Sequence, residues 1–180
     1  LSQVTLFAII IIYGGIVSSE VRNGTVLLVL TKPLSRGAFV AVKVVVNCIF
    51  VAVLLGVGTV LTWGLTLVVF GKVPSGPLWS GAAIWLVLAI LYIAIMTLLS
   101  VAIGSATGAA GAGIGVFALL SIAAIWKPLS DYSPVGLAGQ AASLAARTTT
   151  ASVLWPVLSS LALSAILVGV AIVVFRRKEL

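Results

Sequence analysis

The sequence predicts an all-α integral membrane protein, built as a single transmembrane domain over residues 1–180. Three observations lead to this class. Hydrophobic residues make up 62% of the chain and charged residues only 7%, whereas soluble domains carry about a quarter charged residues. Five long stretches are nearly free of charge. None of them alternates between apolar and polar residues, as a strand of a membrane barrel would.

Each apolar stretch is long enough, or nearly so, to cross about 30 Å of hydrocarbon as a helix. Helices are required because an isolated strand in lipid leaves its backbone hydrogen bonds unsatisfied. The first stretch is short, and the second is long enough to tilt or to begin in the membrane interface. The expected spans are residues 1–17, 39–70, 78–103, 109–126 and 153–175.

The connections between the spans differ in kind. Residues 71–77 read as a tight turn with two prolines, and residues 104–108 as a short turn or a kink between two helices. Residues 127–152 form the longest polar segment, an external loop in the orientation given below. Its alanine-rich middle, residues 137–146, predicts a short helix on the membrane surface.

Basic residues set the orientation, because cytoplasmic loops carry an excess of Lys and Arg. If residues 19–36 are cytoplasmic, three bases lie outside, namely Lys72, Lys127 and Arg147. Seven then lie inside, namely Arg22, Lys32, Arg36, Lys43, Arg176, Arg177 and Lys178. This distribution predicts a multi-pass protein of the cell membrane with a cytoplasmic C-terminus. Five spans then place Leu1 outside, so a sixth span before Leu1 is expected if both ends of the complete protein are cytoplasmic.

Several function classes are disfavoured by the residues themselves. The chain has no His, and its three acids, Glu20, Asp131 and Glu179, belong to different segments. A catalytic set, a metal site and a carboxylate relay within a span are therefore not expected, and the chain is not predicted to be an enzyme by itself. Cys48 is alone, so it forms no disulfide within the chain. The bases do not form runs that would track a nucleic acid.

The stretch "SEVRNGTVLLVLTKPLSR", residues 19–36, has the features of a short interfacial helix between two breaks. Its apolar run, residues 26–30, is too short to span and has charges on both sides. Gly24 can end the preceding helix and Thr25 can cap the next one. Pro33 forces a break, after which Ser35 can cap the following span.

A second group of candidate positions lies within the spans. The glycine-rich stretch 104–117 lacks the spacing of a dinucleotide fingerprint, and no strand precedes it. Its glycines instead form two pairs with GxxxG spacing, which predicts helix packing at Gly104, Gly108, Gly111 and Gly115.

The stretch 19–36 resembles the permease subunits of ABC transporters of the type-two exporter class. The matching pattern runs in order through Glu20, Gly24-Thr25, the apolar run 26–30, Pro33-Leu34-Ser35-Arg36 and Lys43. The basic tail, residues 176–178, also fits. One position departs from the pattern, because many members carry an acid where this chain has Leu27.

The resemblance implies a fold of six spans with both termini cytoplasmic. It further implies a dimer with a second permease copy or a paralogue, seated on two separate ATPase subunits that bind ATP and Mg²⁺. Residues 19–36 would be the coupling element, and residues 127–152 would match short extracellular helices before the last span.

Roles for individual residues follow from this resemblance. Contacts to the ATPase would come from Glu20, Arg22, Lys32 and Arg36. The shape of the element would depend on Gly24, Thr25, Pro33 and Ser35. Lys43 would anchor the next helix at the headgroups. The substrate path would follow small and polar positions at the dimer interface, including Asn47, Thr59 and Thr62.

Two other functions remain open at this point. A non-transporting membrane scaffold or assembly subunit would share the same spans and charges. A secondary carrier would use an ion gradient and be indifferent to ATP.

Overall fold

The described part of the chain is entirely helical. The computed structural model describes residues 2–23, 35–71, 75–126, 133–145 and 153–177. These residues contain no strand, which confirms the all-α class. The helices are α1 (Ser2–Tyr13), α2 (Ser18–Arg22), α4 (Arg36–Phe70), α5 (Gly76–Ile103), α6 (Ala106–Ala123), the 3-10 helix η1 (Pro134–Gly136), α8 (Leu137–Ala145) and α9 (Leu154–Arg177).

Within the described residues, five helical segments are long and apolar enough to cross a membrane, so the chain is a multi-pass membrane protein. These segments are Val4–Arg22, Gly37–Phe70, Gly76–Ile103, Ala106–Ala123 and Leu154–Arg177. With 35 residues, α4 is the longest helix, and at 1.5 Å per residue it extends for about 50 Å. It therefore exceeds the thickness of the hydrocarbon layer.

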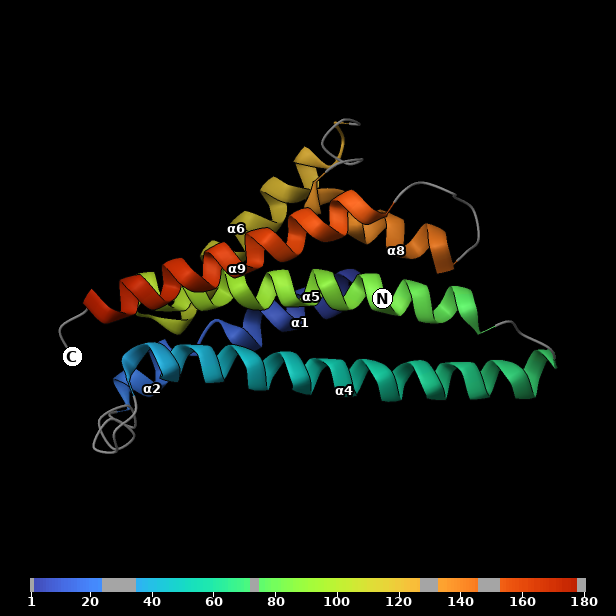
Figure 1. Ribbon diagram of the computed structural model, residues 1–180, viewed down its shortest axis with the longest axis horizontal. Coiled ribbons are helices and arrows are strands. Elements are labelled where there is room, and N and C mark those ends of the chain that lie inside the picture. The colour runs from blue at the N-terminus through green and yellow to red at the C-terminus, as the bar shows by residue number, and fades with distance from the viewer. Residues whose placement is uncertain (1, 24–34, 72–74, 127–132, 146–152, 178–180) are drawn as a thin grey trace.

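Helix α5 lies at the centre of the bundle. Figure 1 shows α9 along one side of α5 and α4 along the other, and α5 also contacts α1, α6 and α8. Its side chains are apolar around most of its circumference, so it can be buried on several faces. Leu91, Ile93 and Met96 are at most 1% exposed.

Helices α4 and α6 instead expose apolar side chains. Val68 and Phe70 of α4 are 85% and 75% exposed, and Leu119 of α6 is 69% exposed. Such surfaces are unfavourable in water and are expected where a helix faces lipid.

Local sequence signals fix several helix ends. Ser35 caps α4 as predicted, because its Oγ accepts a hydrogen bond from the backbone N–H of Ala38 at 3.2 Å. Gly104 ends α5 with φ 72°, a left-handed conformation that favours glycine. Ser105 then caps α6 by accepting from Gly108 N at 3.2 Å. Residues 104–105 thus separate two helices, and α8 occupies the segment for which the sequence predicts a short helix.

The first span contains a break that the prediction of a helical span over residues 1–17 did not include. Helix α1 ends at Tyr13 and α2 begins at Ser18. Gly14 and Gly15 lie in the turn between them. The break is stable because backbone N–H groups that it leaves without a partner in α1 or α2 donate hydrogen bonds to another helix, as described below.

Candidate functional site

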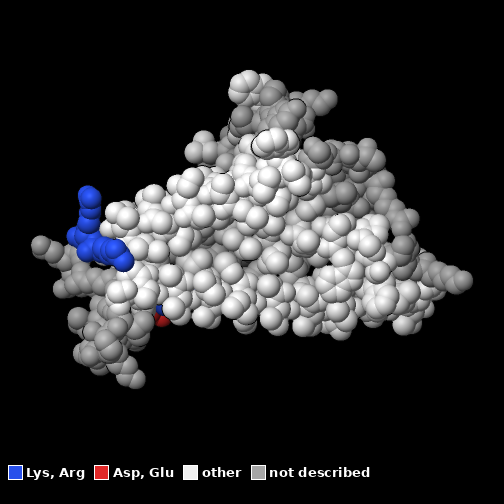
Figure 2. All heavy atoms as spheres, in the orientation of Figure 1, with Lys and Arg blue, Asp and Glu red and all other residues white. Residues whose placement is uncertain are grey.

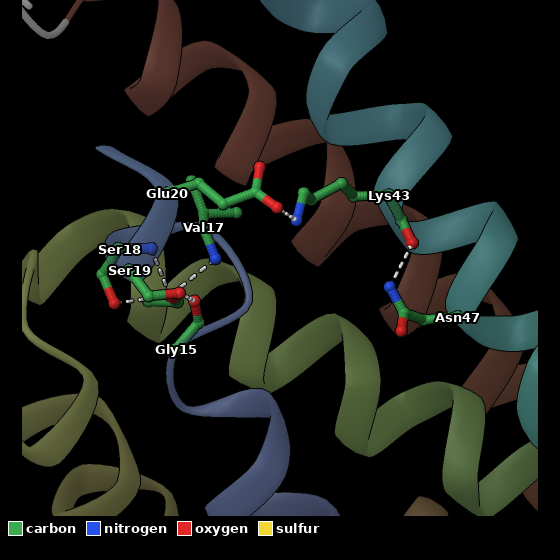
Figure 3. A network of polar contacts seen from close by, with 8 residues as sticks. Gly15, Val17, Ser18, Ser19, Glu20, Lys43 and Asn47 are labelled. Carbon is green, nitrogen blue, oxygen red and sulfur yellow. Dashed lines mark hydrogen bonds and ion pairs between the residues drawn. The ribbon is translucent and has the colours of Figure 1, made fainter. Parts of the chain in front are cut away.

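An ion pair joins the end of α2 to the beginning of α4. Figure 3 shows the Glu20 carboxylate and the Lys43 ammonium group in contact, from two helices that approach from opposite sides. Their side chains are 34% and 22% exposed. The same ammonium group lies 5.7 Å from the centroid of the Phe39 ring, within the range of a cation–π contact. Asn47 Nδ2 donates to the Lys43 carbonyl at 2.7 Å.

The beginning of α4 is also packed against the end of α9. The rings of Phe39 and Phe175 stack with 5.9 Å between their centroids. Gly37 lies beneath the Arg176 guanidinium, where an added Cβ would be 3.0 Å from Nη2. The first turns of α4 therefore contact both α2 and α9.

A buried serine from α5 completes the break between α1 and α2. Ser100 Oγ accepts hydrogen bonds from the backbone N–H groups of Val17 and Ser18 at 3.2 and 3.0 Å, and its hydroxyl donates to Ser18 Oγ at 3.2 Å. Val17 has no side-chain oxygen that could cap α2. Ser100, which lies 83 positions further along the chain, instead accepts the hydrogen bonds of the backbone N–H groups at the start of this helix. Ser100 is 1% exposed and Ser18 is 2% exposed.

We expect Ser100→Ala to destabilise the protein by about 1–3 kcal/mol, because it leaves buried donors without an acceptor. The measurement is the thermal unfolding midpoint of the purified full-length protein in detergent. Ser80→Ala is the matched control, since Ser80 is an exposed serine of the same helix. Equal midpoints for the two variants would contradict the capping role.

The turn between α1 and α2 also touches the first turns of α6. An added Cβ at Gly14 would lie 2.8 Å from the carbonyl oxygen of Ala106 and 3.1 Å from Ala110 Cβ. Only glycine permits this approach of two backbones. The turn is thus held by α5 and α6, and α2 is held by α5 and by the ion pair to α4.

The described basic side chains gather at this end of the molecule. Arg22 is exposed at the end of α2, and Arg176 and Arg177 are exposed at the end of α9. Figure 2 shows the blue side chains at one end of the long axis, while the described surface along the bundle on this face is uncharged. Glu20 and Lys43 lie at the same end.

The predicted coupling residues fall into two groups. Glu20, Arg22 and Ser35 are described, and the structure brings Glu20 together with Lys43, a pairing that the sequence reading did not identify. Gly24, Thr25, Lys32 and Pro33 lie outside the described residues, and of Arg36 the structure describes only the backbone, so their contacts stay predictions.

A cavity of about 650 Å³ lies between α1, α4, α5 and α8. Of the predicted path residues, Thr59 and Thr62 line it, whereas Asn47 does not. The Thr59 hydroxyl donates to the Leu55 carbonyl at 2.7 Å and that of Thr62 donates to the Gly58 carbonyl at 2.8 Å. Each hydroxyl proton is therefore used within α4 itself.

The four glycines predicted for helix packing differ in what they meet within the described part of this chain, and their role in packing stays a prediction. Gly104 is a helix cap, and Gly108 lies against the nearby Ile103 and Ser105. Added Cβ atoms at Gly111 and Gly115 would meet no described atom within 4 Å. A glycine of α6 that does pack closely is Gly113, where a Cβ would lie 2.5 Å from Met96 Sδ and 2.9 Å from Ile10 Cγ2. Gly111 and Gly115 lie on a different face of α6, because the GxxxG spacing does not show which face meets a neighbour.

Sequence reasoning also missed Gly14 and Ser100. A local signal for the break did exist, since Gly14-Gly15 is followed by Ser18-Ser19, which combines residues that end and begin helices. Nothing local to Ser100 distinguishes it from other serines in the spans.

Comparison with known proteins gives a family match over the whole chain. A family model described as "Protein of unknown function (DUF2705)" matches residues 1–180, so the chain belongs to this family. No curated protein and no solved structure matches the chain.

Proposed function

We propose that this member of the DUF2705 family is the membrane-spanning permease subunit of an ATP-driven exporter. Separate ATPase subunits would bind ATP and Mg²⁺, and residues 19–36 would transmit their movement. The resemblance of this stretch to permeases of the type-two exporter class supports the proposal. The observation that carries it is the Glu20–Lys43 ion pair, which ties together the two helices that flank residues 24–34.

The ion pair supports coupling for a mechanical reason. A partner that pushes on residues 24–34 acts on the end of α2 and the beginning of α4 at once, because these two helices are joined. Helix α2 is held on α5 by Ser100, and α4 is packed on α9 by Phe39. Movement at this end therefore reaches several spans rather than one loop.

The distribution of charge and tryptophan supports a cytoplasmic location for this end. The exposed Arg22, Arg176 and Arg177 fit the excess of bases on the cytoplasmic side. Exposed tryptophans lie toward the opposite ends of their helices, as at an outer membrane interface, at Trp79, Trp126 and Trp155. This orientation puts the C-terminus in the cytoplasm and α8 on the outside.

Other features fit the remaining parts of the proposal. The open faces at Gly111 and Gly115 would let a second permease copy or a paralogue approach α6 closely. Thr59 and Thr62 line a cavity and are kept as candidates for the substrate path. Asn47 uses its amide nitrogen on the Lys43 carbonyl, so its part in that path is the weaker proposal.

The proposal is tested by purifying the full-length protein from its own cells in mild detergent and asking whether an ATPase with Walker motifs copurifies. We expect such a complex, and Arg22→Glu should weaken it about tenfold or more, because an interfacial charged contact becomes repulsive. Arg177→Glu is the matched control, since it reverses an exposed base at the same end but outside the coupling element. The readouts are bound ATPase and transport-coupled ATP hydrolysis in nanodiscs.

Two outcomes would overturn the proposal in favour of another function. A purified complex without any ATPase would favour a scaffold or assembly subunit. Substrate movement that follows an ion gradient and ignores ATP would favour a secondary carrier.

A further inference from the structure

The cavity between α1, α4, α5 and α8 has the size and lining of an apolar binding site. Its volume of about 650 Å³ lies within the range of small-molecule sites. Among the residues that the structure describes, no charged side chain lines it. The polar groups of this described lining are the Trp85 indole and the hydroxyls of Thr5, Tyr13, Thr59 and Thr62. The described lining therefore offers no counter-charge to a charged ligand.

The cavity opens sideways between α1 and α4. Helix α1 packs on α5 and α6, whereas α4 packs on α5 and α9, and this arrangement leaves a space between them. The rim of the cavity is formed by three lining residues whose side chains are also exposed, namely Ile12 at 71%, Phe50 at 56% and Leu54 at 55%. Phe50 and Leu54 lie near the middle of the 35-residue α4. The opening therefore faces the hydrocarbon layer.

We infer that this cavity binds the acyl chain of a membrane lipid, which enters sideways from the bilayer. Lipid chains are the medium that meets the rim at this depth, and an apolar wall interacts favourably with methylene groups. The hydroxyls of Thr59 and Thr62 already donate to carbonyls of their own helix, so they present no free donor to the acyl chain of the lipid. The inference goes beyond the proposed function, because it concerns binding and requires neither ATP nor an ATPase.

Gly58 offers a way to fill the cavity without disturbing the fold. It lines the cavity, and an added Cβ would meet nothing within 4 Å. Gly56 is a matched control, since its Cβ position on the same helix is equally open but it does not line the cavity. Both substitutions to leucine favour the helical state, so neither is expected to unfold α4.

The test uses the full-length protein in nanodiscs that contain a phospholipid with a diazirine in its acyl chain. After irradiation, mass spectrometry locates the labelled residues. We expect labels to concentrate on lining residues such as Leu55 and Ala82, well above exposed positions such as Val68. Gly58→Leu should reduce this labelling about tenfold, while Gly56→Leu should stay within about twofold of the wild type.

Three outcomes would overturn the inference. If the Gly58→Leu variant is labelled as strongly as the wild type, the acyl chain of the lipid does not occupy this cavity. Labels spread evenly over Val68, Leu119 and the lining residues would show only general contact with lipid. Disulfide crosslinking between two copies of the Gly58→Cys variant, without labels in the cavity, would show that a second copy of the protein rather than a lipid occupies this site. The labelling assay contains no nucleotide. Its result therefore does not depend on whether the proposed function as an ATP-driven exporter is correct.

Discussion

Replacing Gly14 with leucine is expected to destabilise the protein by about 3 kcal/mol or more, the largest effect of any single change considered. The new Cβ would lie 2.8 Å from the carbonyl oxygen of Ala106 and 3.1 Å from Ala110 Cβ. The first of these atoms belongs to a helix backbone, so a change of side-chain rotamer cannot relieve the contact. Either α6 moves away or the break between α1 and α2 is lost.

The measurement is the yield of monodisperse protein in size-exclusion chromatography, together with its thermal unfolding midpoint. Gly169→Leu is the control, because an added Cβ at that position in α9 meets no described atom within 4 Å. We expect Gly169→Leu to retain the wild-type midpoint or exceed it, as leucine favours helix more than glycine does. Wild-type behaviour of Gly14→Leu would contradict the close approach of the two backbones.

The second large effect is expected at the Glu20–Lys43 ion pair. Lys43→Glu places two carboxylates side by side at a partly buried position, and Glu20→Lys places two ammonium groups there. Each single change should lower stability, and the double change should recover most of the loss. We expect a coupling free energy of about 1–3 kcal/mol, below the cost of breaking a fully buried pair because both side chains retain some exposure.

A double-mutant cycle measures this coupling from the unfolding midpoints of the four proteins. Arg177→Glu serves as a control for the change in net charge, since Arg177 is exposed at the same end of the molecule. If the changes in stability caused by Glu20→Lys and Lys43→Glu simply add in the double variant, the ion pair does not join α2 to α4. Such a result would also remove the main support for the coupling proposal.

Some local details were predictable from short stretches of sequence. Ser35 begins a helix because its side chain can satisfy a backbone N–H three residues later, within one turn. Gly104 ends one because glycine adopts a positive φ without strain. These features depend on neighbouring residues, so no knowledge of the packing was needed.

The candidate site was predicted less completely. The sequence predicts that Glu20 contacts an ATPase subunit and does not indicate its ion pair with Lys43, 23 residues away. Thr59 and Thr62 were named for a substrate path and do line a cavity, whereas Asn47 does not. Helices that are apolar around most of their circumference have no amphipathic stripe, so the sequence does not reveal which face is turned inward.

The amino-acid sequence is enough to show that this protein crosses a membrane as helices, because the preference of each segment for lipid depends on its own composition and length. The helix ends at Ser35 and Gly104 likewise follow from neighbouring residues. Three features become visible only in the packed helices: Ser100 caps the start of α2, Gly113 of α6 packs against Ile10 and Met96, and a cavity lies between α1 and α4. These features depend on the rotation and position of whole helices relative to one another, which residues far apart in the chain determine together.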